Sequence, residues 1–133
     1  MLVYLDANIV IYLVERHPIW EPKATARISA LQATGDIISV SDAHRLECLV
    51  GPFILNDTAT LADYNTFFSA STVKVLPLTA AACEHAARLR ATYNFKPLDA
   101  LHLGAAIEHG CGLFLTNDVQ LKKCPEIAVE ILT

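Results

Sequence analysis

The chain has 133 residues, of which 53% are apolar and 18% charged, and its formal net charge is -4. This length suits a single domain over residues 1–133, and the high apolar fraction predicts that some apolar surface is buried against a partner or a second copy. The negative charge argues against binding to nucleic acid through a broad basic face, although a pair of bound divalent cations would neutralise it.

Apolar runs of strand length alternate with helix-like segments along the chain. The expected elements are, in order, a strand over residues 2–6, a helix that includes 9–14, a helix over 20–34, a strand over 37–40, a helix that carries Glu47, a helix from 58 to about 71, a strand over 73–76, a helix from 80 to 93, a helix that carries Asp99, a strand over 113–116, a short helix over 118–122 and a strand over 127–132. Strands separated by helices require crossover connections. We therefore expect an α/β fold, a three-layer α/β/α sandwich with a mainly parallel central sheet.

Capping and helix-breaking residues indicate where several helices begin and end. Ser41 or Asp42 is expected to cap the helix that carries Glu47, and Gly51-Pro52 to end it. Asp57 and Thr79 are suitable N-caps for the next two helices. Each boundary is set by a side chain that can accept a hydrogen bond from the first helical turn, or by a residue that cannot continue a helix.

The cysteines and the hydropathy indicate the cellular environment. The four cysteines form neither a C-x-x-C pair nor a zinc-ligand spacing, which favours reduced thiols over a disulfide framework. No apolar run approaches the roughly 20 residues that span a bilayer, and the N-terminus lacks the pattern of a secretion signal. We expect a cytoplasmic protein that does not contact a membrane.

Four acidic residues lie where strand-like runs give way to helix-like ones: Asp6, Glu47, Asp99 and Asp118. The carboxyl ends of parallel strands share one edge of a sheet, so these acids can converge although they are far apart in sequence. Close carboxylates repel and raise one another's pKa unless a cation compensates. We therefore expect the four acids to bind a divalent metal ion through their oxygens. Asp99, Asp118 and Glu47 would each also suit an ordinary position in or before a helix.

Short motifs around the four acids resemble those of the PIN-domain family. They are Leu5-Asp6-Ala7-Asn8-Ile9-Val10, Leu46-Glu47-Cys48-Leu49-Val50-Gly51, Leu98-Asp99-Ala100-Leu101-His102-Leu103 and Leu115-Thr116-Asn117-Asp118. The resemblance spans nearly the whole chain, with the motifs in order and suitably separated. Because the chain is short and shows no accessory domain, it looks most like a VapC-type toxin of a toxin-antitoxin pair.

This resemblance implies a ribonuclease that depends on Mg²⁺ or Mn²⁺, with RNA as substrate. It makes Asp6 and Asp99 the direct metal ligands, while Glu47 and Asp118 bind the metal directly or through water. Such an ion activates a water molecule and stabilises the charge that develops on the phosphate. The resemblance also implies a cognate antitoxin as partner.

Other polar residues are expected to support this site. Asn8 and Thr116 can hold a carboxylate or a phosphate oxygen without binding the metal themselves. Arg45 and Lys96 each lie within three residues of one of the four acids and could contact an RNA phosphate, although solvated side chains are equally expected. His102 is expected to be a buried histidine satisfied by a neighbour instead of a zinc ligand.

A homodimer is expected from the apolar fraction and from three aromatic residues, Tyr64, Phe67 and Phe68, although these side chains would equally suit the core.

The strongest rival to an enzyme is a catalytically inactive PIN-like scaffold that binds RNA or protein partners. A phosphatase of the haloacid-dehalogenase type is disfavoured because it needs a second aspartate where this chain has Asn8. A receiver-like phosphoacceptor is disfavoured because no acid adjoins Asp6.

Overall fold

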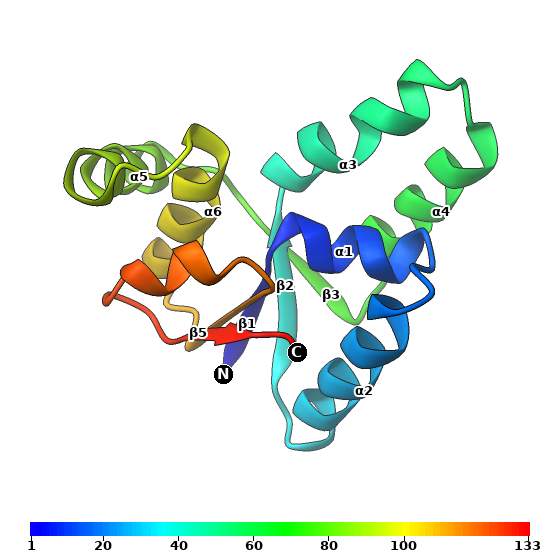
Figure 1. Ribbon diagram of the computed structural model, residues 1–133, viewed down its shortest axis with the longest axis horizontal. Helices are drawn as coiled ribbons and strands as arrows, with labels where there is room; N and C mark the ends of the chain where they lie inside the picture. The colour runs from blue at the N-terminus through cyan, green and yellow to red at the C-terminus, as the bar shows by residue number, and fades with distance from the viewer.

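The computed structural model describes residues 1–133 and contains one five-stranded sheet with helices on both faces (Figure 1). The strand order is β3-β2-β1-β4-β5, and all neighbouring strands are parallel. The strands are β1 (Leu2–Leu5), β2 (Ile37–Ser41), β3 (Val73–Leu76), β4 (Leu113–Thr116) and β5 (Val129–Ile131). The helices are α1 (Ala7–Val14), α2 (Trp20–Ala33), α3 (Ala43–Ile54), α4 (Thr58–Ser69), α5 (Ala80–Tyr93), α6 (Pro97–Glu108) and the 3₁₀-helix η1 (Val119–Lys123). The expected three-layer α/β sandwich is confirmed.

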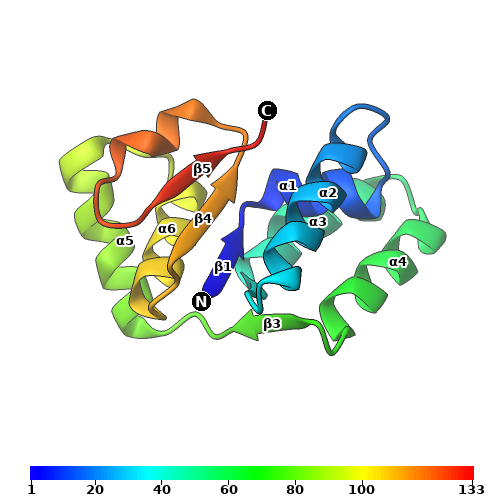
Figure 2. The same ribbon diagram turned by 90° about the horizontal axis from the view of Figure 1, so that it is seen from below.

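The side chains of the central strand β1 alternate between two separate apolar cores. Val3 and Leu5 pack with residues of α1, α2, α3 and α4, whereas Tyr4 packs with residues of α5 and α6. Figure 2 shows these two groups of helices on opposite sides of the sheet. Burial on both faces explains why β1 and β4 are almost continuously apolar in sequence.

The structure departs from the sequence-based expectation at Pro52, at Asp42 and in the last strand, and several other element ends shift by one or two residues. Pro52 does not end α3, which continues to Ile54. The chain loses only the bond that a proline cannot donate; Leu55 still donates to Gly51 O (3.1 Å), and the proline ring is buried. Asp42 occupies the N-cap position but makes no capping bond, because its carboxylate pairs with Arg45 instead. The last strand is also shorter than residues 127–132.

None of the helices combines the length and the apolar character that crossing a bilayer would require.

Helices α5 and α6 pack closely on one another, at a contact that requires glycine. A Cβ atom added at Gly104 would lie 2.7 Å from the carbonyl oxygen of Ala82 and 2.9 Å from the backbone nitrogen of Ala86. Both are backbone atoms, so a side chain at Gly104 would have to push the two helices apart.

Gly104→Ala is therefore expected to destabilise the protein by about 1–3 kcal/mol, the cost of overpacking a core. Gly51→Ala is the matched control, because Gly51 is also helical but has open space around its Cα. There alanine should stabilise by about 0.5–1 kcal/mol through helix propensity. Urea denaturation of both variants measures the difference, and equal stabilities would contradict the close helix contact.

Candidate active site

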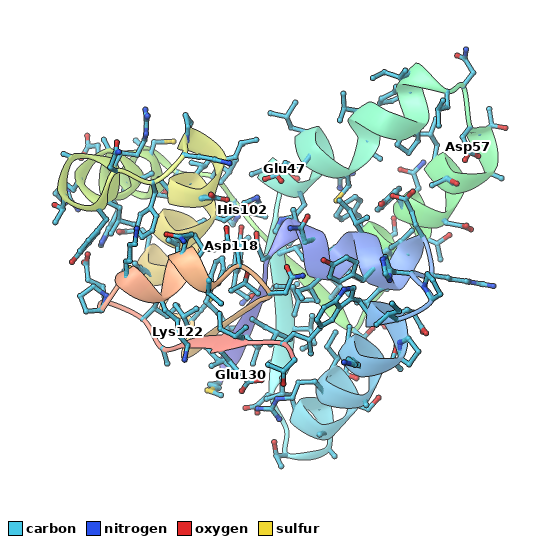
Figure 3. The ribbon with its side chains drawn as sticks, in the orientation of Figure 1. Glu47, Asp57, His102, Asp118, Lys122 and Glu130 are labelled. Atoms are coloured by element: carbon cyan, nitrogen blue, oxygen red, sulfur yellow. The ribbon has the colours of Figure 1, made fainter.

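The four predicted acids lie on four different elements around the carboxyl ends of the central strands. Asp6 follows β1 and is the N-cap of α1, and Asp118 follows β4 and is the N-cap of η1. Asp99 lies in the first turn of α6, and Glu47 on α3. In Figure 3, Glu47 and His102 lie next to each other between α3 and α6, and Asp118 lies at the same end of the central strands. The fold thus brings segments from the whole chain to one edge.

Asp6 is a buried carboxylate, with a residue exposure of only 5%. Its Oδ1 accepts a hydrogen bond from the Ala7 amide (2.8 Å), and its Oδ2 accepts one from the Thr116 hydroxyl (2.7 Å). Burial raises the pKa of Asp6 above its usual value, and the bond from Thr116 opposes that rise. Thr116 also accepts a bond from the Asp118 amide (3.0 Å), so one hydroxyl ties the end of β1 to the turn after β4.

Asp99 experiences the charges of the other three acids. Burial raises its pKa, and the negative charges of Asp6, Asp118 and Glu47 raise it further, whereas His102 lowers it. No lysine or arginine forms an ion pair with any of the four acids. Asp99 also accepts no hydrogen bond from any other side chain or amide, so both of its oxygens remain free to bind a ligand.

Glu47 accepts a hydrogen bond from His102 Nε2 at 2.6 Å. His102 is fully buried, and its other ring nitrogen is hydrogen-bonded to the Tyr4 hydroxyl at 2.8 Å. The expectation of a buried histidine satisfied by its neighbours is confirmed. Tyr4 was not among the residues predicted from the sequence, although a tyrosine within a buried apolar strand is a signal that its hydroxyl needs a partner.

The remaining predicted residues contribute unequally to this edge. Thr116 contacts Asp6 directly, as described above. Asn8 is exposed on the first turn of α1 and makes no hydrogen bond with the acids. The Arg45 guanidinium pairs with Asp42 and lies 4.7 Å from the centre of the Phe68 ring, so it is directed to other partners. Lys96 is exposed at the N-cap position of α6.

The carboxylate oxygens of the four acids suit a hard divalent cation, although the side chains do not form a coordination sphere in this arrangement. No group of three or more His, Cys, Asp or Glu side chains lies in a geometry that could hold one metal ion. The negative charges of the other three acids nevertheless act on Asp99, and no lysine or arginine forms an ion pair with any of the four. A cation bound among carboxylate oxygens would relieve that repulsion, and oxygen donors of this kind are those that Mg²⁺ and Mn²⁺ prefer.

Solved structures with the same fold come from several bacteria. The chain is similar to VapBC2 from Rickettsia felis bound to a promoter DNA fragment, with a TM-score of 0.83 and 19% identity over 100% of both chains. It is also similar to DNA-bound VapBC from Salmonella typhimurium, with a TM-score of 0.79 and 23% identity over 100% of both chains. VapC20 from Mycobacterium tuberculosis, a toxin that cleaves the sarcin-ricin loop, has a TM-score of 0.71 and 15% identity over 91% of this chain and 93% of its own.

No curated protein matches the sequence. The sequence does match the family model described as the PIN domain, and the match extends over residues 3–127. That range begins in β1 and ends after η1, and it includes all four acids of the sheet edge. The chain therefore belongs to the PIN domain family.

Proposed function

We propose that this protein is a metal-dependent ribonuclease in which Asp6, Glu47, Asp99 and Asp118 bind Mg²⁺ or Mn²⁺. The observation that carries the proposal is the placement of four acids around the carboxyl ends of the central strands, where no lysine or arginine forms an ion pair with any of them. Such an arrangement costs stability in a folded protein. Proteins tolerate a cost of this kind at functional sites, where a ligand compensates it.

In this proposal some residues bind the metal, and others position the residues that do. Asp6 and Asp99 hold the metal, and Thr116 fixes the orientation of Asp6 through the hydrogen bond to Oδ2. Glu47 is held at Oε1 by His102, which leaves Oε2 for the metal or for a water molecule. The bound ion supplies an activated water and stabilises the phosphate charge during hydrolysis.

RNA is the proposed substrate. The structurally similar VapC20 is described as a toxin that cleaves the sarcin-ricin loop, which supports this choice. On this chain, the exposed Lys96 lies three residues before Asp99, and Lys122 and Lys123 lie in the last turn of η1 beyond Asp118. These ammonium groups can contact phosphates on either side of the cleaved bond.

A cognate antitoxin is the proposed protein partner, because the similar structures from Rickettsia and Salmonella are VapBC complexes and a Klebsiella pneumoniae neighbour is a toxin-antitoxin complex. We also propose a homodimer. The aromatic residues that suggested one are mostly core residues, since Tyr64 and Phe68 lie on the buried face of α4. Five of the nine large exposed apolar side chains instead lie along α3 and the turn after it: Leu46, Val50, Phe53, Ile54 and Leu55. This row supplies the unburied apolar surface that the composition predicts, and a second copy is its proposed occupant.

The purified protein should cleave single-stranded or loop RNA with Mg²⁺ or Mn²⁺ and should lose that activity in EDTA. Asp6→Asn should lower the rate by about 100-fold or more, since even residues that only support metal ligands contribute 10- to 100-fold. Asp63→Asn is the matched control, because Asp63 is exposed on α4. Cleavage that survives EDTA would refute a metal mechanism. Absence of cleavage in every condition would favour the scaffold.

Asp6→Asn should also stabilise the metal-free protein or leave its stability unchanged. The pKa of Asp6 is raised by burial, so the folded state binds its proton more tightly than the unfolded state does. The parent should consequently lose stability as the pH rises from the ordinary aspartate pKa of 3.8 through the raised folded pKa. The asparagine variant should lack that loss.

Thermal melts with Mn²⁺ complete this test. At about ten times its dissociation constant, Mn²⁺ should stabilise the parent by about 1.4 kcal/mol, which for this size corresponds to a rise in Tm of roughly 3 to 6 °C. Asp6→Asn should show a much smaller rise, and Asp63→Asn the full one. If Asp6→Asn destabilises the metal-free protein and keeps the full rise, Asp6 is a structural residue.

Phe53→Asp should convert a dimer into a monomer, because it places a charge within the proposed apolar contact. Phe53 is 62% exposed, so the substitution should leave the fold of the monomer intact. Ile19→Asp is the control, since Ile19 is 60% exposed in the connection between α1 and α2. Light scattering at micromolar concentrations measures the mass. A parent that is monomeric throughout would contradict the proposed dimer.

A further inference from the structure

A chain of hydrogen bonds runs from the interior of the protein to Glu47. The Ser41 hydroxyl lies 2.7 Å from the Tyr4 hydroxyl, which lies 2.8 Å from His102 Nδ1. His102 Nε2 then lies 2.6 Å from Glu47 Oε1. Ser41, Tyr4 and His102 are all fully buried, and Glu47 is the only member that solvent reaches.

The chemistry of the groups gives this chain a direction. A carboxylate can only accept, so His102 Nε2 donates to Glu47. With a neutral imidazole, Nδ1 is then the acceptor for the Tyr4 hydroxyl, and the Tyr4 oxygen accepts from Ser41. Burial raises the pKa of Tyr4, so its hydroxyl keeps the proton that it donates. Every member has a partner, which is required of polar groups removed from water.

A second histidine holds the imidazole of His102 in place. The ring of His44 packs edge-on against that of His102, with 4.5 Å between their centres. His44 Nε2 lies 2.7 Å from the carbonyl oxygen of Leu5, the residue before Asp6. Burial, together with the nearby His102, lowers the pKa of His44 to about 3, so it is neutral and donates to that carbonyl. The same buried cluster therefore touches the strand end that carries Asp6.

We propose that His102 and Tyr4 are positioning residues that fix the carboxylate of Glu47 for metal binding. This inference rests on the proposed function. Glu47 has a long, flexible side chain, and His102 restrains it by holding one of its two oxygens. The Tyr4 hydroxyl in turn keeps Nδ1 as the acceptor and directs the Nε2 proton to Glu47. Outer partners of metal ligands commonly act in this way.

A pair of substitutions separates this role from simple filling of the core. In His102→Gln, the amide nitrogen takes the place of Nε2 and keeps a donor for Glu47, while the partner of Tyr4 is lost. In His102→Asn, the amide takes the place of Nδ1 and keeps a partner for Tyr4, while the bond to Glu47 is lost. Each variant loses one hydrogen bond of His102, either the bond to the buried Tyr4 hydroxyl or the bond to Glu47, which solvent reaches, so the stability of both should fall.

The experiment measures the dissociation constant of Mn²⁺ by calorimetry, without RNA, and then kcat and KM on an RNA oligonucleotide. His102→Asn should weaken Mn²⁺ binding by about 10- to 100-fold and lower kcat with little change in KM. His102→Gln should remain close to the parent in both quantities. His85→Asn is the control, because His85 on α5 also contacts a glutamate, Glu126 at 3.0 Å, but lies outside the acidic edge.

Equal Mn²⁺ affinities for the parent, His102→Gln and His102→Asn would overturn the proposal, because His102 would then only fill the core. If thermal melts show that the His102 variants do not fold, Tyr4→Phe provides the same test while keeping the aromatic ring. It should weaken Mn²⁺ binding, and an unchanged affinity would overturn the proposal. A parent that neither binds Mn²⁺ nor cleaves RNA would instead overturn the proposed function.

Discussion

The burial of the Asp6 carboxylate is the constraint on which the rest of this edge depends. The Asp6 amide donates to Leu115 O at 2.9 Å, which extends the pairing of β1 and β4 by one residue and holds the acid between the two strands. A carboxylate in this position is costly unless it is hydrogen-bonded. The Ala7 amide and the Thr116 hydroxyl meet that requirement, and both lie where the strands turn into helical segments. The hydrogen bond by which Asp6 caps α1 therefore also helps to fix its carboxylate in the site.

The other acids are held by elements whose own packing limits their movement. Asp99 lies on α6, which the contact at Gly104 places directly against α5. Asp118 caps η1 by accepting from the Gln120 amide, so it has a local structural role in addition to its proposed one. Glu47 lies on the solvent-exposed helix α3 and depends on His102 for its orientation. Rigid elements therefore hold three of the acids, and a buried hydrogen-bond chain holds the fourth.

The two faces of the sheet serve different purposes because successive residues of a strand point in opposite directions. Val3 and Leu5 of β1 complete the core beneath α1 to α4. Tyr4, between them, points to α5 and α6, where its ring stacks on Phe114 and its hydroxyl reaches His102. A single side chain thus joins an apolar core to the polar edge, and this explains how a mostly apolar interior accommodates two histidines, a serine and a tyrosine hydroxyl without an unpaired buried group.

The order and type of the elements could be predicted from the sequence, because the spacing of apolar residues and caps such as Asp57 and Thr79 are local signals. The sequence also predicted that Asp6 and Asp99 would share an edge, since that follows from a parallel sheet. Local signals failed where tertiary packing outweighed them: Pro52 stays within α3 because its ring is buried. For Tyr64 and Phe68 the sequence left core and dimer contact open, and both lie on the buried face of α4, against which α1 and α3 pack. The hydrogen bond between Tyr4 and His102 joins residues that are 98 positions apart, and the one between His102 and Glu47 joins residues that are 55 positions apart. These contacts could not be predicted from the sequence, because no sequence period relates a strand to two helices that pack at its end.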